Sequence, residues 1–251
     1  YYLPMDKEGI NPDDLVSLYK KHKIRMIFLN PAFQNPTGTS LSQSRRKAVL
    51  DISSKYGIPI VEDDPYSLTS FMGDEVNTLK SMDSHGNVLY ISSLSKIVAS
   101  GLRIGWIIGP KAVIERLTDA KQQIDFGHSS FTQWIANDFL ESEDFPAHIK
   151  KLIMQLKKRR DQIVKSLRFF LGNQVDFHVP EGGIHIWCKL RKEINEMKLL
   201  EESIKRGIIY VPGTTMGSEK GYVRFTYARE KEENIHEGIK RFAEALQVVQ
   251  E

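Results

Sequence analysis

Five side chains that could take part in chemistry follow short apolar runs in the first half of the sequence. Asn35 lies in “PAFQNPTG” after “IRMIFLN”, and Asp63 and Tyr66 lie in “VEDDPY” after “IPI”. Lys96 lies in “SSLSK” after “NVLYI”, and Arg103 follows in “SGLRIGW”. An amide, a carboxylate, a phenol, an amine and a guanidinium that converge on one face would make a polar site in an apolar frame. Because Lys96 and Arg103 stand among apolar residues, we expect both to be buried.

The runs before these side chains predict the strands of a parallel sheet. Near-continuous apolar runs separated by helices are typical of strands that helices cover on both faces. The predicted strands span residues 24–30, 58–64, 87–93 and 103–109. In an open parallel sheet, ligands bind at the carboxyl ends of the strands, and most of the five side chains come directly after such ends. The sequence therefore predicts an α/β fold with a polar site at that edge.

The chain changes character after residue 110. Residues 111–171 are predicted to be mostly helical, and the rest alternates short strands with helices in an α+β pattern. We therefore expect a large domain over residues 1–147 and a smaller domain over residues 148–251. The basic stretch “KKLIMQLKKRRDQIVKSL” could be a nucleic-acid helix, but the spacing of Leu152, Leu156 and Ile163 favours an amphipathic helix with a solvated basic face.

Composition bears on the class of protein and on its partners. The chain has 251 residues, of which 41% are hydrophobic, and its net charge of +3 gives no reason to expect nucleic acid or an anionic membrane as a partner of this segment. The single cysteine, Cys188, cannot form an internal disulfide, which favours a cytoplasmic location. His178 and His185 do not suggest a metal site. The sequence opens on “YYLPMDKEGI” without an initiator methionine, and we interpret it as a fragment of a longer polypeptide.

Each candidate also has an ordinary structural explanation. Asn35 could be only a turn residue, Asp63 could cap the following turn, and Tyr66 could be a packing residue. Lys96 in a serine-rich loop would usually be solvated, and Arg103 could form a surface ion pair. All these explanations would have to coincide at successive strand ends, so a shared site is favoured.

The motifs resemble those of the fold-type-I, pyridoxal-phosphate-dependent aminotransferases of class I and II. Besides “NPTG”, “VEDDPY” and “SLSKIVASGLRIGW”, the stretches “VPEGGIHIW”, “VPG” and “YVRFTYA” follow in the family's order, so the resemblance spans nearly the whole chain. It implies a large domain with a mostly parallel sheet and a smaller α+β C-terminal domain. It further implies that the four strands are neighbours, with the last antiparallel, and that the family's other strands flank them. We therefore expect two sheet edges that are exposed or covered by another chain.

The resemblance implies catalytic roles for three residues around pyridoxal phosphate. Lys96 would hold the aldehyde of the cofactor covalently and would carry the proton at the α-carbon of the substrate. Asp63 would keep the ring nitrogen protonated, so that the ring accepts electrons. Tyr66 would hydrogen-bond the phenolic oxygen of the ring together with Asn35.

The resemblance also implies residues that bind without reacting. Ser93 and Arg103 would hold the phosphate, and Ser95 is a further candidate for that role. Arg224 in “YVRFTYA” would bind the α-carboxylate of the substrate, because its planar fork suits a carboxylate, and Asn35 is a candidate on the substrate side as well. The implied partners are an amino acid, a 2-oxo acid and a second copy of the chain.

Two functions fit the resemblance. The first is an aminotransferase that moves an amino group between an α-amino acid and a 2-oxo acid. The second is the effector domain of a MocR-type transcriptional regulator of the GntR family, which would sense pyridoxal phosphate or an amino compound and would contact DNA through another domain. A degenerate scaffold is disfavoured, because the positions of Lys96, Asp63 and Arg103 are all filled. We favour the aminotransferase.

Overall fold

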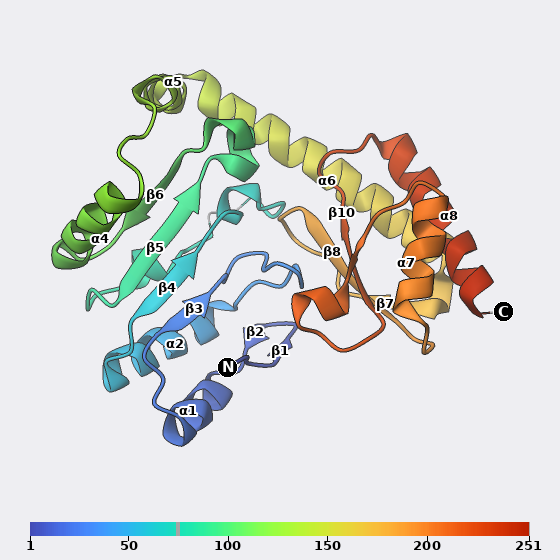
Figure 1. Ribbon diagram of the computed structural model, residues 1–251, viewed down its shortest axis with the longest axis horizontal. Helices are drawn as coiled ribbons and strands as arrows, with labels where there is room; N and C mark the ends of the chain where they lie inside the picture. Colours follow the sequence, from blue (N-terminus) through green and yellow to red (C-terminus); the bar gives the residue numbers. More distant parts are fainter. Residues whose placement is uncertain (74–75, 251) are drawn as a thin grey trace. The chain divides into compact units, whose positions relative to one another are not determined.

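The computed structural model describes residues 1–73 and 76–250 (Figure 1). The chain divides into two compact units. Unit 1 contains residues 1–33 and 39–152, and unit 2 contains residues 34–38 and 153–251. The short segment around Asn35 therefore belongs to the same unit as the C-terminal part of the chain.

Unit 1 is built on a four-stranded sheet of order β3-β4-β5-β6 (Figure 1). The strands are β3 (Ile27–Leu29), β4 (Ile60–Asp63), β5 (Val88–Ser93) and β6 (Gly105–Ile108). Strands β3, β4 and β5 are parallel to one another, and β6 runs antiparallel to β5. The expected strand order and the antiparallel last strand are thus confirmed. Each observed strand lies within its predicted range, and Arg103 stands just before β6 instead of within it.

Helices precede or follow the parallel strands, and the first two of them lie where the sequence predicted helices. They are α1 (Pro12–Lys21), α2 (Gln43–Tyr56) and the short α3 (Leu79–Met82). The side chain of Asn11 accepts a hydrogen bond from the backbone of Asp13 at the start of α1, and Gly57 ends α2 in the left-handed conformation. The apolar core of this part is fully buried at Val49, Ile60, Leu79 and Val88, among others.

A second apolar cluster of unit 1 lies behind the segment that carries Lys96. Helices α4 (Lys111–Ile124) and α5 (Ser130–Glu141) follow β6, and the long α6 (Asp144–Phe170) begins in unit 1. Leu94 and Ile97 pack against Ala136 of α5, with Ile149 and Leu152 of α6 beside them. This cluster supports the Lys96 segment from one side.

The sheet of unit 1 has β3 at one edge and β6 at the other. Both edges carry exposed apolar side chains: Phe28 on β3 is 61% exposed and Ile108 on β6 is 50% exposed. The expected exposed edges are therefore present.

Unit 2 contains an antiparallel four-stranded sheet of order β7-β8-β10-β9. Its strands are β7 (Val175–Phe177), β8 (His185–Leu190), β9 (Val211–Pro212) and β10 (Tyr222–Thr226), and its other helices are α7 (Glu196–Lys205) and α8 (Glu232–Gln250). Ile186, Cys188, Val223 and Phe225 alternate along β8 and β10 and are buried. The ring of Phe242 on α8 packs edge-on against Phe225, so this helix covers the buried face of the sheet.

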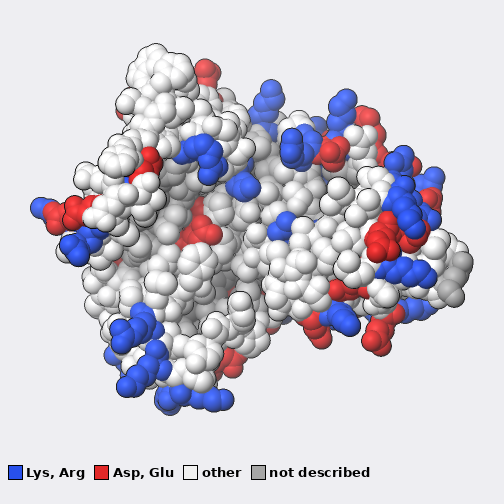
Figure 2. All heavy atoms as spheres, viewed as in Figure 1, with Lys and Arg blue, Asp and Glu red and all other residues white. Residues whose placement is uncertain are grey.

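Helix α6 is amphipathic, as its spacing predicted. Leu156, Ile163 and Leu167 are buried, and most of the basic side chains of the helix are exposed, whereas Arg160 is buried. Lys157 pairs with Asp161 on the same helix. On the face that Figure 2 shows, basic side chains are spread over several elements, many with acidic neighbours. No helix in the described part of the chain combines the length and apolar character needed to cross a membrane.

Candidate active site

Three successive carboxylates end strand β4, and the structure separates their tasks. Glu62 is fully buried and accepts hydrogen bonds from the backbone of Leu79 and Lys80, at the start of α3. Asp64 accepts from the backbone of Ser67 and from the hydroxyl of Tyr90. Both groups therefore support the fold. The carboxylate that caps the turn is Asp64, not Asp63.

Asp63 is the carboxylate of the three that accepts no hydrogen bond from a backbone group of the described residues. Its side chain is partly buried, and the amide of Asn30 donates to its carboxylate over 3.5 Å and to its backbone carbonyl over 2.9 Å. Burial raises the pKa of Asp63, and the charge of Asp64 adds to this effect, whereas the Asn30 hydrogen bond opposes it. A cation beside this carboxylate would relieve the cost of its burial.

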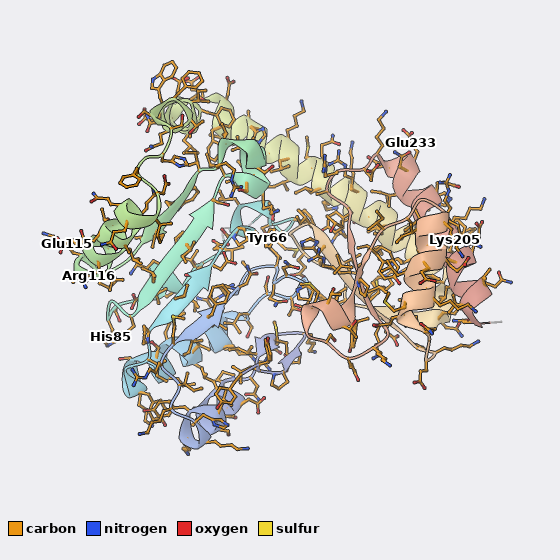
Figure 3. The ribbon with its side chains drawn as sticks, viewed as in Figure 1. Tyr66, His85, Glu115, Arg116, Lys205 and Glu233 are labelled. Atoms are coloured by element: carbon orange, nitrogen blue, oxygen red, sulfur yellow. The ribbon has the colours of Figure 1, made fainter. Side chains whose placement is uncertain are left out.

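Tyr66 lies on the turn that follows β4 (Figure 3). Its side chain is buried, with 3% of its surface exposed. Its backbone carbonyl accepts from both the backbone N–H and the hydroxyl of Thr69, which closes the turn. The phenol thus comes from a turn that is held independently of the ring.

Lys96 lies on a π-helical turn, Ser95–Ala99, directly after β5. The carbonyl of Leu94 accepts from the backbone of both Val98 and Ala99. Single π-helical turns are frequent at functional sites. The expectation that Lys96 is buried was wrong: Ile97 enters the apolar cluster, so Lys96 lies on the exposed side of the turn.

Arg103 is also exposed, contrary to expectation. It stands between two short elements with φ at +56°, in the left-handed region that non-glycine residues rarely adopt, and its guanidinium donates to the carbonyl of Ser100 over 3.3 Å. The described carboxylates form no ion pair with Lys96 or Arg103. Such backbone strain is typical of ligand clamps.

Ser93 is the last residue of β5, and Ser95 directly precedes Lys96. Both are partly buried, and the backbone of Ser95 donates to the hydroxyl of Ser93 over 3.4 Å. The preceding Ser92 serves the fold, because its hydroxyl donates to the carbonyl of Asp64. Unit 1 thus carries the hydroxyls, the amine and the carboxylate at the carboxyl ends of the adjacent strands β4 and β5.

Unit 2 brings Asn35 and Arg224 together, although they are 189 residues apart in the sequence. Arg224 lies on β10 between Trp187 of β8 and Val211 of β9, and its guanidinium donates to the side-chain oxygen of Asn35 over 2.6 Å. The turn of Asn35 is closed by the backbone of Gly38, which donates to the carbonyl of Gln34. Arg224 is therefore not a strand arginine directed only to solvent.

Sequence reasoning missed two residues that support the site. Asn30 is the first residue after β3, and the strand-end rule used for the other candidates could have found it. His148 on α6 lies against the Lys96 turn, with Nε2 2.7 Å from the carbonyl oxygen of Ile97. Nothing in the sequence pattern pointed to a contact between segments so far apart. His185, which suggested no particular role, is buried and hydrogen-bonded to Thr226.

A mixed sheet with an amine, a carboxylate, hydroxyls and a guanidinium at or near its strand ends is typical of the fold-type-I pyridoxal-phosphate proteins. The family model of aminotransferase class I and II matches residues 1–242, and the chain belongs to that family. Pyridoxal phosphate is the cofactor that this family uses.

Relatives of known name include both enzymes and regulators. Aromatic-amino-acid aminotransferase 1 of Thermococcus litoralis is 37% identical over 97% of this chain and 60% of the relative. The uncharacterised HTH-type transcriptional regulator YisV of Bacillus subtilis is 37% identical over 96% of this chain and 50% of the relative. Kynurenine aminotransferase of Pyrococcus horikoshii, solved in complex with PMP, matches with a TM-score of 0.93 at 34% identity, over 98% of this chain and 63% of that chain. The chain thus spans between half and two thirds of the length of these relatives.

The side chains present in unit 1 fit pyridoxal phosphate. Asp63 is partly buried with a raised pKa, which suits a partner for a protonated ring nitrogen. Lys96 supplies an accessible amine for the aldehyde, and Ser93 and Arg103 supply hydrogen-bond donors for a phosphate. Pyridoxal phosphate, with its ring nitrogen, aldehyde and phosphate, therefore matches the side chains near the ends of β4 and β5.

Proposed function

We propose that the protein is a pyridoxal-phosphate-dependent aminotransferase, which moves an amino group between an α-amino acid and a 2-oxo acid. The observation that carries this proposal is the placement of Asp63 and Lys96 at the carboxyl ends of adjacent parallel strands, where the two carboxylates beside Asp63 are engaged by backbone groups of the described residues and that of Asp63 is not. Membership of the aminotransferase family and the enzyme relatives support it.

In this proposal three residues act on the reacting atoms. When bound, pyridoxal phosphate supplies an electron sink for charge that develops at the α-carbon of the substrate. Lys96 would hold the cofactor through Nζ, and the same amine would move the proton at the substrate α-carbon. Asp63 holds the proton on the ring nitrogen, and Tyr66 donates a hydrogen bond to the phenolic oxygen.

The remaining residues bind and orient. Ser93, Ser95 and Arg103 bind the phosphate, the arginine through charge-assisted hydrogen bonds. Arg224 binds the α-carboxylate of the amino acid, and Asn35, its hydrogen-bond partner, takes part in binding cofactor and substrate. We further propose a large domain over residues 1–147 and a small domain over residues 148–251, a homodimer and a cytoplasmic location.

The test titrates the full-length protein with pyridoxal phosphate and then adds amino acids one at a time. We expect a yellow absorbance on binding that Lys96→Ala abolishes, and bleaching of this absorbance by at least one amino acid, with the 2-oxo acid as the product. A Lys96→Ala variant with the absorbance of the parent protein would contradict the assignment of Lys96.

A second candidate is the effector domain of a transcriptional regulator, which relatives such as YisV favour. A regulator would acquire the yellow absorbance but would keep it with every amino acid in the panel, and its full-length chain would bind a DNA duplex. An aminotransferase would convert at least one amino acid to its 2-oxo acid and would not bind the duplex. Both assays on one protein preparation therefore distinguish the two functions.

A further inference from the structure

His148 contacts the turn of Lys96 from a distant part of the sequence. Its Nε2 lies 2.7 Å from the carbonyl oxygen of Ile97, the residue that follows Lys96. A carbonyl oxygen only accepts hydrogen bonds, so Nε2 carries the hydrogen and donates it. Both residues belong to unit 1, with His148 near the beginning of α6.

Aromatic contacts fix the direction of the His148 ring. The ring of Phe139 on α5 meets it edge-on, with centroids 5.5 Å apart and an interplanar angle of 75°. Phe145 meets Phe139 in the same manner at 5.7 Å. A histidine ring that meets one aromatic ring edge-on, with a second ring behind that neighbour, has fewer alternative orientations, so its hydrogen bond has a defined direction.

The position of Lys96 is determined by the backbone of its turn and not by contacts of its side chain. Its side chain is exposed and forms no ion pair with the described carboxylates. The turn is held at its start by the carbonyl of Leu94, and beyond Lys96 by the buried side chain of Ile97 and the hydrogen bond from His148. Loss of the last contact would leave the backbone after Lys96 without a polar anchor from α6.

We propose that His148 is a positioning residue, which fixes the turn that carries Lys96 through its hydrogen bond to the carbonyl of Ile97. The inference rests on the proposed function, because it assigns Lys96 the covalent attachment of pyridoxal phosphate. A reacting amine has to be placed closely, and a displacement of ~1 Å at a reacting group can lower a rate by ~100-fold. His148 acts only through the backbone of the turn and touches no reacting atom in this assignment.

Two substitutions separate the hydrogen bond from the packing of the ring. His148→Phe fills the ring volume and keeps the contact with Phe139 but removes the donor. His148→Gln carries an amide donor of similar reach. His236→Phe is the matched control, because His236 likewise has one polar contact, with the hydroxyl of Ser166, and packs against an aromatic ring, that of Phe170, but lies in unit 2.

The first measurement needs no cofactor. Hydrogen exchange of the backbone amides of Val98 and Ala99 reports how firmly the turn is held. In the full-length protein we expect His148→Phe to speed their exchange about 10-fold, the size expected for one lost hydrogen bond to a fixed donor. His148→Gln and His236→Phe should exchange these amides within about threefold of the parent rate.

The second measurement follows the attachment of pyridoxal phosphate to Lys96. Borohydride traps the attached cofactor at timed intervals, and mass spectrometry of the peptide that contains Lys96 counts it. We expect His148→Phe to slow attachment about 10-fold or more, and His148→Gln to restore most of the parent rate. The absorbance spectrum of the loaded protein should differ from the parent spectrum in His148→Phe and should be closer to it in His148→Gln.

The outcomes distinguish the two proposals. A parent protein that never carries the cofactor on Lys96 would overturn the proposed function and this inference with it. Normal attachment on Lys96 in the parent and an equal rate in His148→Phe would overturn the inference alone. If His148→Gln is as slow as His148→Phe, the ring packing and not the donated hydrogen bond is responsible, and the inference is wrong. Should His148→Phe not fold, His148→Asn replaces it, because its shorter amide does not reach Ile97.

Discussion

At the scale of single residues, the three carboxylates at the end of β4 show how neighbours of one type acquire different tasks. Glu62 and Asp64 accept hydrogen bonds from groups of the fold, whereas among the described residues only the side chain of Asn30 donates to the carboxylate of Asp63. A carboxylate that is partly buried without a cation is costly, unless a ligand supplies one. The difference therefore predicts opposite effects of substitution at Asp63 and Asp64.

Asp63→Asn should not destabilise the cofactor-free protein at pH 7. The pKa of Asp63 in the folded protein is raised, so the carboxyl stabilises the fold only at low pH, and this contribution is lost as the pH rises through the folded pKa. Asp64→Asn should lower the free energy of unfolding by about 1–3 kcal/mol, because it disturbs the bonds from Ser67 and Tyr90. Urea denaturation at pH 7 measures both. With pyridoxal phosphate present, Asp63→Asn should bind it at least about 10-fold more weakly. Equal losses of stability in the two variants would contradict the division of tasks.

Arg224 is expected to affect the substrate more than the cofactor. Arg224→Lys should raise the amino-acid concentration for half-maximal bleaching about 10- to 100-fold, because an ammonium cannot form the paired hydrogen bonds of a guanidinium. Uptake of pyridoxal phosphate should stay near that of the parent protein. Arg191→Lys is the matched control, since Arg191 forms an exposed pair with Asp176 in the same unit. Weaker cofactor uptake with unchanged substrate dependence would refute the assignment.

At the scale of elements, the connections of the sheet in unit 1 are held by side chains that accept from backbone groups. Glu62 caps α3, and Asp83 holds the loop from α3 to β5. The side chain of Asp83 is 2% exposed and accepts from the backbone of His85, Asn87 and Val88. These contacts set the direction in which β5 enters the sheet, and β5 leads directly to the turn of Lys96.

Asp83 should make unit 1 sensitive to acid. Burial alone would raise its pKa, but the backbone hydrogen bonds and Lys80 outweigh burial and hold the pKa below its ordinary value of 3.8. A lowered folded pKa gives stability that is present above the unfolded pKa and is lost as the pH falls through the folded pKa. Asp83→Asn should therefore cost about 1–3 kcal/mol at pH 7, and the difference from the parent should shrink below about pH 4. Urea denaturation at pH 7 and pH 3 checks this, with the exposed Asp176→Asn as a control of little effect. A difference that is equal at both pH values would exclude an ionic contribution of Asp83.

At the scale of the whole molecule, the chain consists of two units that carry different parts of the chemistry. Unit 1 holds the proposed attachment residue Lys96, and unit 2 holds the proposed carboxylate-binding Arg224 with Asn35. The segment of residues 34–38 belongs to unit 2 although the flanking sequence builds unit 1.

Pyridoxal phosphate should protect unit 1 locally. At a concentration of 100 times its dissociation constant, a ligand of the native state adds about 2.7 kcal/mol of stability. In the full-length protein we expect the slowest new exchange at the end of β4 and over residues 93–103, and little change in α7 and α8. Hydrogen exchange with and without the cofactor measures this, and phosphate alone is the control. Protection confined to α7, α8 and their sheet would contradict the placement of the cofactor.

The sequence by itself determined the class of fold, the four strands and the identity of the candidate residues. Apolar runs of strand length and the polar residues after them are local features, so they can be recognised from the order of residues along the chain. The same features predicted the antiparallel last strand and the exposed edges through the resemblance, and both are present.

Only the tertiary structure decided which of these residues serve the fold and which are left for chemistry. Asp63 differs from Asp64 because of Tyr90 and Asn30, which come from other strands and loops. Lys96 is exposed although the sequence pattern predicted its burial, because the next residue, Ile97, is the one that enters the apolar cluster. Contacts such as His148 with Ile97 and Arg224 with Asn35 depend on how distant segments pack, and packing energy is shared among many residues with no fixed spacing in sequence.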